Sequence, residues 1–207
     1  MIWGVLSSPP PICAIGGYYM DNAKEMAQVL LDEVRQNFAS VVWTHKIQEK
    51  QADIYANRYK IFETCNIIFA GFTSCGVVAI FLCDDYITKV LTTVVSFGSF
   101  FLSAYLKGFD LKNLERQHRI AANKFIIVRN QLLHIIAELH MESNLEQIKA
   151  EYQQILSDLN KLYLEAPSTT DSAVSKASEA LNIKNEYTYT DEEIDHFLPN
   201  NLKGGIH

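Results

Sequence analysis

Two long segments of this chain carry almost no charge, and they limit its possible folds more than any other feature. Residues 64–83, TCNIIFAGFTSCGVVAIFLC, are twenty residues without a formal charge. Residues 90–106, VLTTVVSFGSFFLSAYL, are seventeen more, and this stretch lengthens if it starts at Tyr86 and the Lys89 ammonium reaches the membrane surface. A helix needs about 17 to 25 mostly apolar residues to cross the hydrocarbon core of a bilayer. Both segments have the length of a transmembrane helix.

The alternative is that both segments are buried helices of a soluble core. Neither segment has a polar face wide enough for a surface helix. A chain of 207 residues also has little other apolar sequence with which to cover two such helices. Residues 84–89 between the segments are too few for anything except a tight antiparallel turn. The sequence therefore predicts a transmembrane hairpin, with helices at 64–83 and 90–106 and a short external turn at 84–89.

Basic residues lie on one side of this predicted hairpin. Those nearest the spans are Arg58, Lys60, Lys107, Lys112, Arg116 and Arg119, whereas the turn holds two acids and one lysine. Loops rich in Lys and Arg stay in the cytoplasm. Both termini are therefore predicted to be cytoplasmic, together with residues 21–63, 107–165 and 166–207.

Residues 1–20 are apolar but do not resemble a secretory signal peptide. They lack a basic beginning, and Pro9, Pro10 and Pro11 would interrupt the apolar helix that a signal peptide requires. We predict a flexible apolar arm for this segment.

Residues 21–63 have the pattern of helices that lead into the first span. Met26, Val29, Leu30 and Val34 recur at helical spacing after Asp21, a candidate N-cap. A helix then resumes through residues 45–63, which contain no Gly or Pro before the span begins.

Two heptad seams follow the second span. Their residues are Leu111, Leu114, His118, Ala121, Phe125, Val128, Leu132, Ile135 and Leu139, then Leu145, Ile148, Tyr152, Ile155, Leu159 and Leu162. The alternating spacing of three and four residues is typical of packed helices, and Asn144 is a candidate cap for the second seam. Each seam needs a partner, either the helix before the first span or copies from other subunits. The predicted fold is an all-α membrane protein, in which the hairpin continues into long cytosolic helices that form a bundle or coiled coil.

The segment 166–207 is predicted to be an acidic tail with short helices. Residues 141–207 hold twelve acidic and five basic side chains, and Pro167 ends the long helix. A weak helix is expected at 173–181, and Thr190 with Glu193 forms a capping box for a second helix that ends by Phe197. The tail is either solvated or docked, on a partner or on the basic helix 107–129. The net charge of −6, without a long basic run, argues against direct nucleic-acid binding.

The sequence has no pattern of an enzyme, a metal site or a cofactor site. It contains no CxxC, no HExxH and no Gly-rich phosphate loop, and its six histidines are scattered. We predict no catalytic residues, no metal ligands and no cofactor. His118 lies at a seam position, where it acts either as a polar core group that fixes helix register or as a pH sensor.

Hydroxyl groups form a stripe on the second span. Thr92, Ser96, Ser99 and Ser103 are spaced by four, three and four residues, and Asn66 and Thr73 give the first span a sparser polar edge. A hydroxyl that faces lipid gains nothing, whereas it is stabilised when it faces water or bonds a neighbouring helix. The six residues are therefore candidates for pore lining or for helix packing.

Four features follow one another in an order that can be compared with known families. They are the helix bearing Trp43-Thr44-His45-Lys46, its unbroken run into the first span, the minimal turn and the segment ERQHRIAANKFIIVRNQL. In this last segment Ala121, Ala122, Phe125 and Arg129 lie in the helical register expected of SLATT proteins. The arrangement resembles the SLATT family over roughly residues 22 to 200. These are two-transmembrane effectors encoded beside nucleotide-second-messenger synthases, nucleotide sensors or reverse transcriptases in bacterial conflict systems.

The resemblance implies an antiphage or abortive-infection effector of the bacterial inner membrane. It implies a homo-oligomer that opens a pore or disrupts the membrane when activated by a nucleotide signal or by a co-encoded sensor, synthase or reverse transcriptase. It supplies no catalytic residues. A second hypothesis is a membrane-anchored adaptor that recruits a cytosolic partner through its coiled coil and acidic tail.

Overall fold

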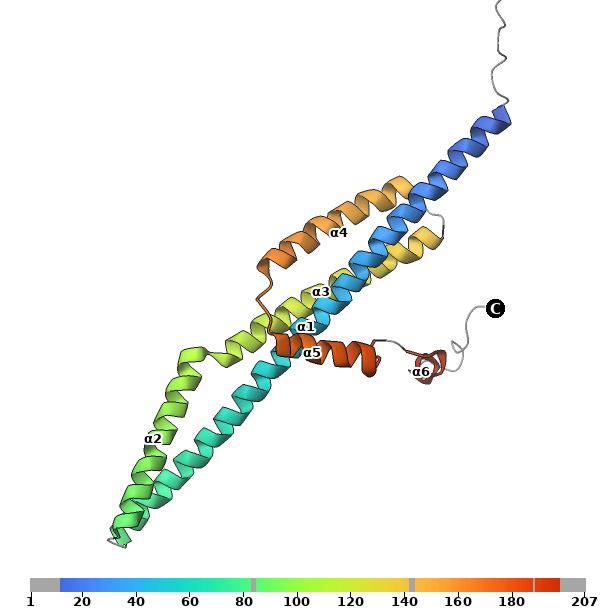
Figure 1. Cartoon of the computed structure of the whole chain (residues 1–207). Helices are drawn as coiled ribbons and strands as arrows, with labels where there is room; N and C mark the ends of the chain where they lie inside the picture. The colour runs from blue at the N-terminus through green and yellow to red at the C-terminus, as the bar shows by residue number, and fades with distance from the viewer. Residues whose placement is uncertain (1–11, 83–84, 142–143, 188, 198–207) are drawn as a thin grey trace, which may run out of the picture. The chain divides into compact units, whose positions relative to one another are not determined.

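All regular elements that the structure describes are helices. The computed structural model describes residues 12–82, 85–141, 144–187 and 189–197, with side chains from Lys24 onward. The elements are α1 (Ile12–Leu82), α2 (Tyr86–Phe109), α3 (Leu111–His140), α4 (Leu145–Glu165), α5 (Asp171–Ser178), the π-helical turn η1 (Glu179–Ile183) and α6 (Asp191–Phe197) (Figure 1). The all-α prediction is confirmed.

The chain divides into two compact units, each of which contains part of α1 and part of α3. The bundle unit comprises residues 1–45 and 123–166, and the hairpin unit comprises residues 46–122 and 167–207.

Helix α1 is longer than the sequence pattern predicted. It begins at Ile12, before the expected cap at Asp21, and it continues into the first span as one helix. Pro11 is the last residue before it that cannot belong to a helix interior, and the chain has no further proline until Pro167. Residues 12–20 of the predicted arm are therefore helical, whereas residues 1–11 lie outside the described residues.

The bundle unit packs α1, α3 and α4 around an apolar core. Its core residues are Leu30, Val34, Val41, Phe125, Val128, Leu132, Ile135, Ile148, Tyr152, Ile155, Leu159 and Leu162. Leu132 and Ile135 are completely buried, and full burial of a side chain of this size contributes about 1.5–3 kcal/mol. In this unit α1 of the same chain packs against the seam residues from Phe125 onward. Asn144 caps α4, because its Oδ1 accepts a hydrogen bond from Glu146 N at 3.1 Å.

The one polar group on the second seam is satisfied inside the bundle. The hydroxyl of Tyr152 donates to Glu33 Oε1 at 3.0 Å and accepts from Asn37 Nδ2 at 2.6 Å. Burial raises the pKa of Tyr152 to about 12, so the group stays neutral.

Two aspartates set the ends of α2 in the hairpin unit. The Asp85 carboxylate accepts from Thr88 N at 3.0 Å and so caps the start of the helix. Asp110 follows the end of α2 with a left-handed φ of 38°, and its Oδ1 accepts from Asn113 N at 3.2 Å. The sequence pattern predicted that the second span continues directly into the long helix after it. The structure instead has a break between the two helices at Asp110. Asp110 ends α2 and begins α3.

Candidate functional site in the membrane hairpin

Two glycines set how closely α1 and α2 approach each other. A Cβ atom on Gly76 would lie 2.8 Å from Thr92 Cγ2, closer than real Cβ contacts allow, and one on Gly98 would lie 3.2 Å from Phe69 Cε2. A Cβ atom on Gly71 would instead meet nothing within 4 Å. Helix α2 therefore packs on the Gly76 side of α1 and leaves the Gly71 side open.

The hydroxyl stripe of α2 lies against α1. Ser99 Oγ and Ser103 Oγ donate to Asn66 Oδ1 at 3.0 and 3.1 Å. Ser96 Oγ lies 3.4 Å from Thr73 Oγ1, and Thr92 is buried against Gly76. The structure thus brings all six predicted polar residues to the α1–α2 contact, where in a single chain they join the two helices.

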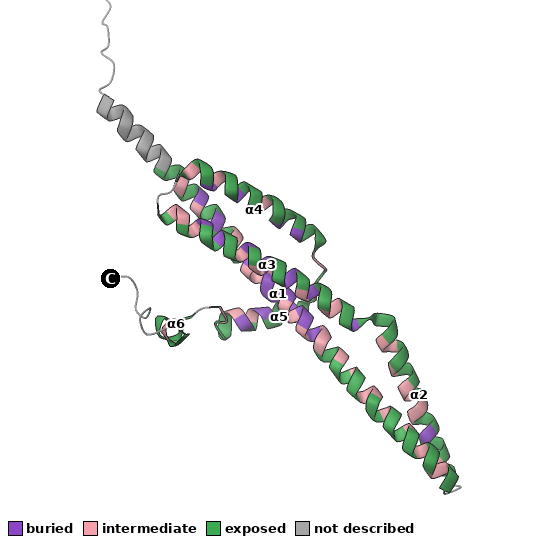
Figure 2. Ribbon diagram, turned by 180° about the vertical axis from the view of Figure 1, so that it is seen from behind, coloured by how far each residue is buried: buried purple, intermediate pink, exposed green. Residues whose placement is uncertain are grey.

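The outer surface of the hairpin is apolar. Its large exposed side chains include Ile67, Phe72, Val78, Phe81 and Leu82 on α1 and Leu91, Val94, Phe97, Phe100 and Phe101 on α2. Each is at least 58% exposed, and α1 and α2 show few buried positions along the hairpin in Figure 2. Helices of a soluble core would be covered, whereas a continuous apolar surface of this kind requires a non-aqueous neighbour. Both helices are long and apolar enough to cross a membrane.

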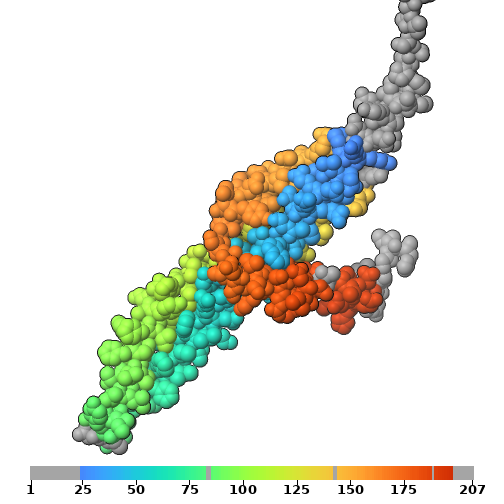
Figure 3. Space-filling model, in the orientation of Figure 1, coloured from blue at the N-terminus to red at the C-terminus, as the bar shows by residue number. Residues whose placement is uncertain are grey.

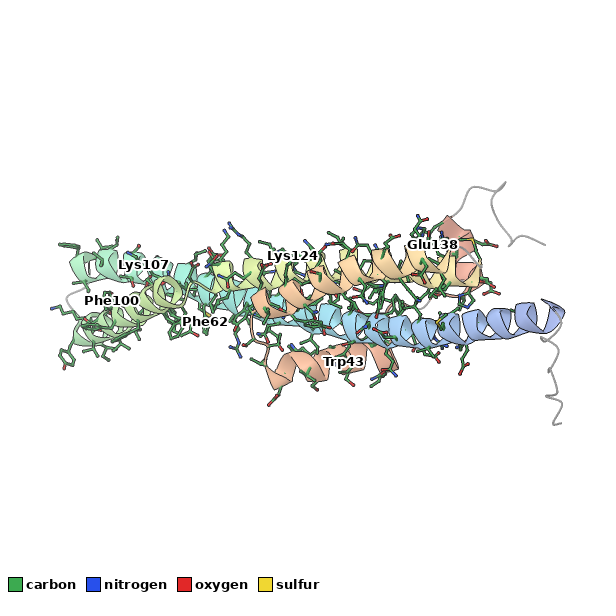
Figure 4. The ribbon with its side chains drawn as sticks, turned by 90° about the horizontal axis from the view of Figure 1, so that it is seen from above. Trp43, Phe62, Phe100, Lys107, Lys124 and Glu138 are labelled. Carbon is green, nitrogen blue, oxygen red and sulfur yellow. The ribbon has the colours of Figure 1, made fainter. Side chains whose placement is uncertain are left out.

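Aromatic side chains gather near the ends of the predicted spans, and they were not among the predicted site residues. The ring of Phe62, labelled on α1 in Figure 4, lies 5.0 Å from that of Tyr105, which in turn lies 4.5 Å from the ring of Phe109. The Lys112 ammonium lies 5.9 Å from the centre of the Tyr59 ring. Tyrosine and lysine are typical of the membrane–water interface. Their positions near the ends of the two apolar runs were the available sequence signal.

A buried polar layer joins the part of α1 that precedes the first span to the part of α3 that follows the second. His118 Nδ1 lies 2.6 Å from Gln48 Oε1, and the imidazole stacks on Tyr55 at 5.4 Å. A glutamine oxygen only accepts, so Nδ1 carries the proton and donates. Arg119 pairs with Asp53 at 2.9 Å beside this layer. Burial lowers the pKa of His118, which favours the neutral form.

The acidic tail is docked, and the hydrogen bonds that hold its beginning are made to α1. Gln48 Nε2 donates to the Pro167 carbonyl at 2.9 Å. Gln51 Oε1 accepts from Thr170 N at 2.9 Å and from Thr170 Oγ1 at 2.7 Å. Figure 3 shows the tail, in orange-red, against the surface of α1. Gln48 and Gln51 were missed in the sequence because isolated glutamines on a helix carry no specific signal.

Lys46 contacts Glu186 and Tyr187 of the docked tail. Its side chain is 3% exposed, and its ammonium pairs with Glu49 at 2.7 Å and with Glu186. The same ammonium lies 4.4 Å from the centre of the Tyr187 ring. Burial alone would lower the pKa of Lys46, but the hydrogen bonds to Glu186 and Glu49 outweigh it and raise the pKa above the usual lysine range. Lys46 is therefore a buried cation in this structure.

The predicted seam residues divide between the two units. Leu111, His118 and Ala121 are buried in the hairpin unit, with Leu114 half-buried. The residues from Phe125 to Leu162 belong to the bundle core, with Leu139 and Leu145 at its edge. Among the described residues, no three His, Cys, Asp or Glu side chains are placed to hold a metal ion.

The hairpin with its apolar exterior and polar contact defines a protein of the two-transmembrane-helix class. A family model described as "SMODS and SLOG-associating 2TM effector domain family 4" matches residues 30–193. The match covers most of the chain, which therefore belongs to this family, and the resemblance to SLATT effectors is confirmed. Comparisons with curated proteins and with solved structures give no match.

Proposed function

We propose that this protein permeabilises the bacterial inner membrane when an infection signal activates it. Several copies assemble through their hairpins, and the assembly opens a pore or disrupts the bilayer. The activating signal is a nucleotide, or a co-encoded sensor, synthase or reverse transcriptase. Membership of a two-transmembrane effector family supports the effector role, and the chemistry of the hairpin supports the permeabilising step.

The observation that carries the proposal is the polar contact inside the hairpin. Polar groups within a membrane span are expensive and are characteristic of functional sites. A simple membrane anchor does not require them, because two helices can also join through close packing of small residues. Here Ser99 and Ser103 share the single acceptor Asn66.

The same contact suggests how the hairpin changes state. A single hairpin encloses no pore, because Thr92 and Phe69 fill the space between its helices. Conduction therefore requires several copies with the stripe of α2 turned toward a common axis. Ser99 and Ser103 then exchange their bonds to Asn66 for bonds to water, which a hydroxyl can both donate and accept.

The orientation of the hairpin is testable by chemical labelling. We expect both termini in the cytoplasm, with Thr88 outside. In a chain without its native cysteines, Thr88→Cys should react with a membrane-impermeant maleimide on intact spheroplasts. Ser168→Cys should react only after lysis. The opposite pattern contradicts the orientation.

Membrane potential tests the function itself. Induced expression in bacteria should collapse the signal of a potential-sensitive dye, and the purified protein should release dye from liposomes. Release of a small dye with retention of a large dextran indicates a pore, whereas release of both indicates bilayer disruption. An adaptor that only recruits a cytosolic partner leaves both the potential and the liposomes intact.

A further inference from the structure

The contact of Lys46 with Glu49, Glu186 and Tyr187, called the latch below, has the properties of a reversible contact. Burial of an ammonium is strongly unfavourable unless the charge is paired. Two of the three groups around Lys46, the carboxylate of Glu186 and the ring of Tyr187, come from the tail, and only Glu49 comes from α1. When the tail leaves, the cation loses Glu186 and Tyr187, keeps Glu49, and becomes accessible to water.

A contact of this kind is only weakly stabilising. The desolvation of a buried ion pair offsets most of the attraction between its charges. The ion pair therefore adds little to the free energy of the closed state, and a competing interaction at Glu186 shifts the population toward the open state.

The backbone of the tail favours release as well. Asn185 and Tyr187 have φ values of 51° and 79°, in the left-handed region that tyrosine rarely adopts. This conformation presents Glu186 and Tyr187 to Lys46. Such strain persists only while surrounding contacts hold it, so it disappears when the tail opens.

The contact also lies on the element that enters the membrane. Gln48 and Gln51 hold the tail on α1, and α1 continues without interruption through the first predicted span, which starts at Thr64. From Gln51 to Thr64 the helix rises about 20 Å. A continuous helix transmits rotation along its length, so the tail restrains the same helix that must move relative to the hydroxyl stripe of α2.

We propose that residues 167–187 form a strap that closes on Lys46 and holds the effector in its resting state. Opening the strap frees α1 to rearrange and lowers the threshold for membrane permeabilisation. The restraint rests on the permeabilising function proposed above, whereas the opening of the strap does not.

The test reverses one charge of the latch. Glu186→Lys places a third cation beside Lys46 and Lys50, which lies 3.5 Å from Glu186. The matched control is Glu151→Lys, the same change on the exposed surface of α4. The double variant Lys46→Glu/Glu186→Lys keeps two acids and two lysines at the latch and should close it again. Hydrogen exchange in the full-length protein reports strap opening, and a potential-sensitive dye in cells reports permeabilisation.

We expect exchange over residues 167–187 to increase at least about tenfold in Glu186→Lys, since a tenfold change corresponds to a small shift in an opening equilibrium. It should be unchanged in Glu151→Lys and largely restored in the double variant. Glu186→Lys should also depolarise cells at an expression level at which the wild type does not.

Two results overturn the strap. One is unchanged exchange over residues 167–187 in Glu186→Lys. The other is increased exchange together with the same expression threshold for depolarisation as the wild type. If the strap opens as expected but neither chain depolarises cells at any expression level, the permeabilising function fails, and the restraint fails with it.

Discussion

The bundle unit and the membrane hairpin distribute polarity in opposite ways. The bundle buries Leu132 and Ile135 and exposes charge, such as the surface pair of Lys124 and Glu165 at 3.1 Å. The hairpin places the hydroxyl of Ser99 at the helix contact and exposes rings such as that of Phe81, which is 86% exposed.

The difference follows from the solvent of each unit. In water the removal of apolar surface drives helices together. In lipid this force is absent, and close packing with hydrogen bonds between helices takes its place. Helix α1 belongs to both units and follows one rule at Val34, which is fully buried among apolar side chains, and the other at Asn66.

The largest expected effect comes from a charge in the bundle core. Leu132→Asp buries an unpaired carboxylate where the native side chain is completely buried, which should destabilise the bundle by about 3–5 kcal/mol. Chemical denaturation of the detergent-solubilised protein, followed by circular dichroism, measures this loss. Leu133→Asp is the matched control. The Leu133 side chain is 48% exposed, so this substitution should change stability little. Equal effects of the two changes would contradict an intramolecular seam.

A smaller effect is expected from crowding the hairpin contact. Gly76→Val forces a side chain against Thr92 and should cost about 1–3 kcal/mol. Gly71→Val makes the same chemical change on the open side of α1 and should be tolerated. Energy transfer between labels on Glu63→Cys and Lys107→Cys, in a chain without native cysteines, should fall only in Gly76→Val. A similar fall in both variants would place the helix contact elsewhere.

Removal of two hydroxyls should have a smaller effect on stability and a selective effect on activity. Ser99→Ala with Ser103→Ala deletes both hydrogen bonds to Asn66, each worth about 0.6 kcal/mol in a membrane. The hairpin should remain inserted, but depolarisation should weaken because the stripe then offers water only the hydroxyls of Thr92 and Ser96.

The control for the hydroxyl variant is Ser74→Ala with Thr93→Ala. Both side chains are exposed and bond only to carbonyls of their own helix. This pair should leave depolarisation unchanged. Full depolarisation by the Ser99→Ala/Ser103→Ala protein would exclude these two hydroxyls from the conduction path.

Local patterns predicted the elements of this fold that depend on near neighbours in sequence. The cap at Asn144 and the capping box of Thr190 and Glu193 are present, the latter with Glu193 N donating to Thr190 Oγ1 at 3.3 Å. The end of α2 at Asp110 was missed, because an aspartate after a span also fits a continuous helix. Only its left-handed backbone distinguishes the two.

The tail contact was beyond such patterns. Gln51 and Thr170 are 119 residues apart, and neither belongs to a periodic stripe. In the sequence, nothing distinguishes Lys46 from a surface cation. Its burial becomes evident only in the structure, where Glu186 lies beside it. The regular spacing of the hydroxyl residues predicted that they share one face of the second span. Such spacing does not predict what that face contacts. Asn66 of α1 determines what this face contacts in the single chain.

The last expected effect depends on pH and comes from the polar layer around His118. Burial lowers the pKa of His118 below its usual value of 6.5, so between the two pKa values the unfolded chain binds a proton that the folded chain does not. Stability of the hairpin unit should therefore be complete above about pH 6.5 and fall as the pH is lowered, by at most about 1.4 kcal/mol per pH unit. Denaturation at about pH 7.5 and 5.5 measures this, well above the range in which carboxylates titrate. His118→Gln should remove the dependence, and His134→Gln, on an exposed side chain of α3, should retain it. An unchanged dependence in His118→Gln would assign the titration to another group and leave His118 as a group that only fixes the register of α3 against Gln48.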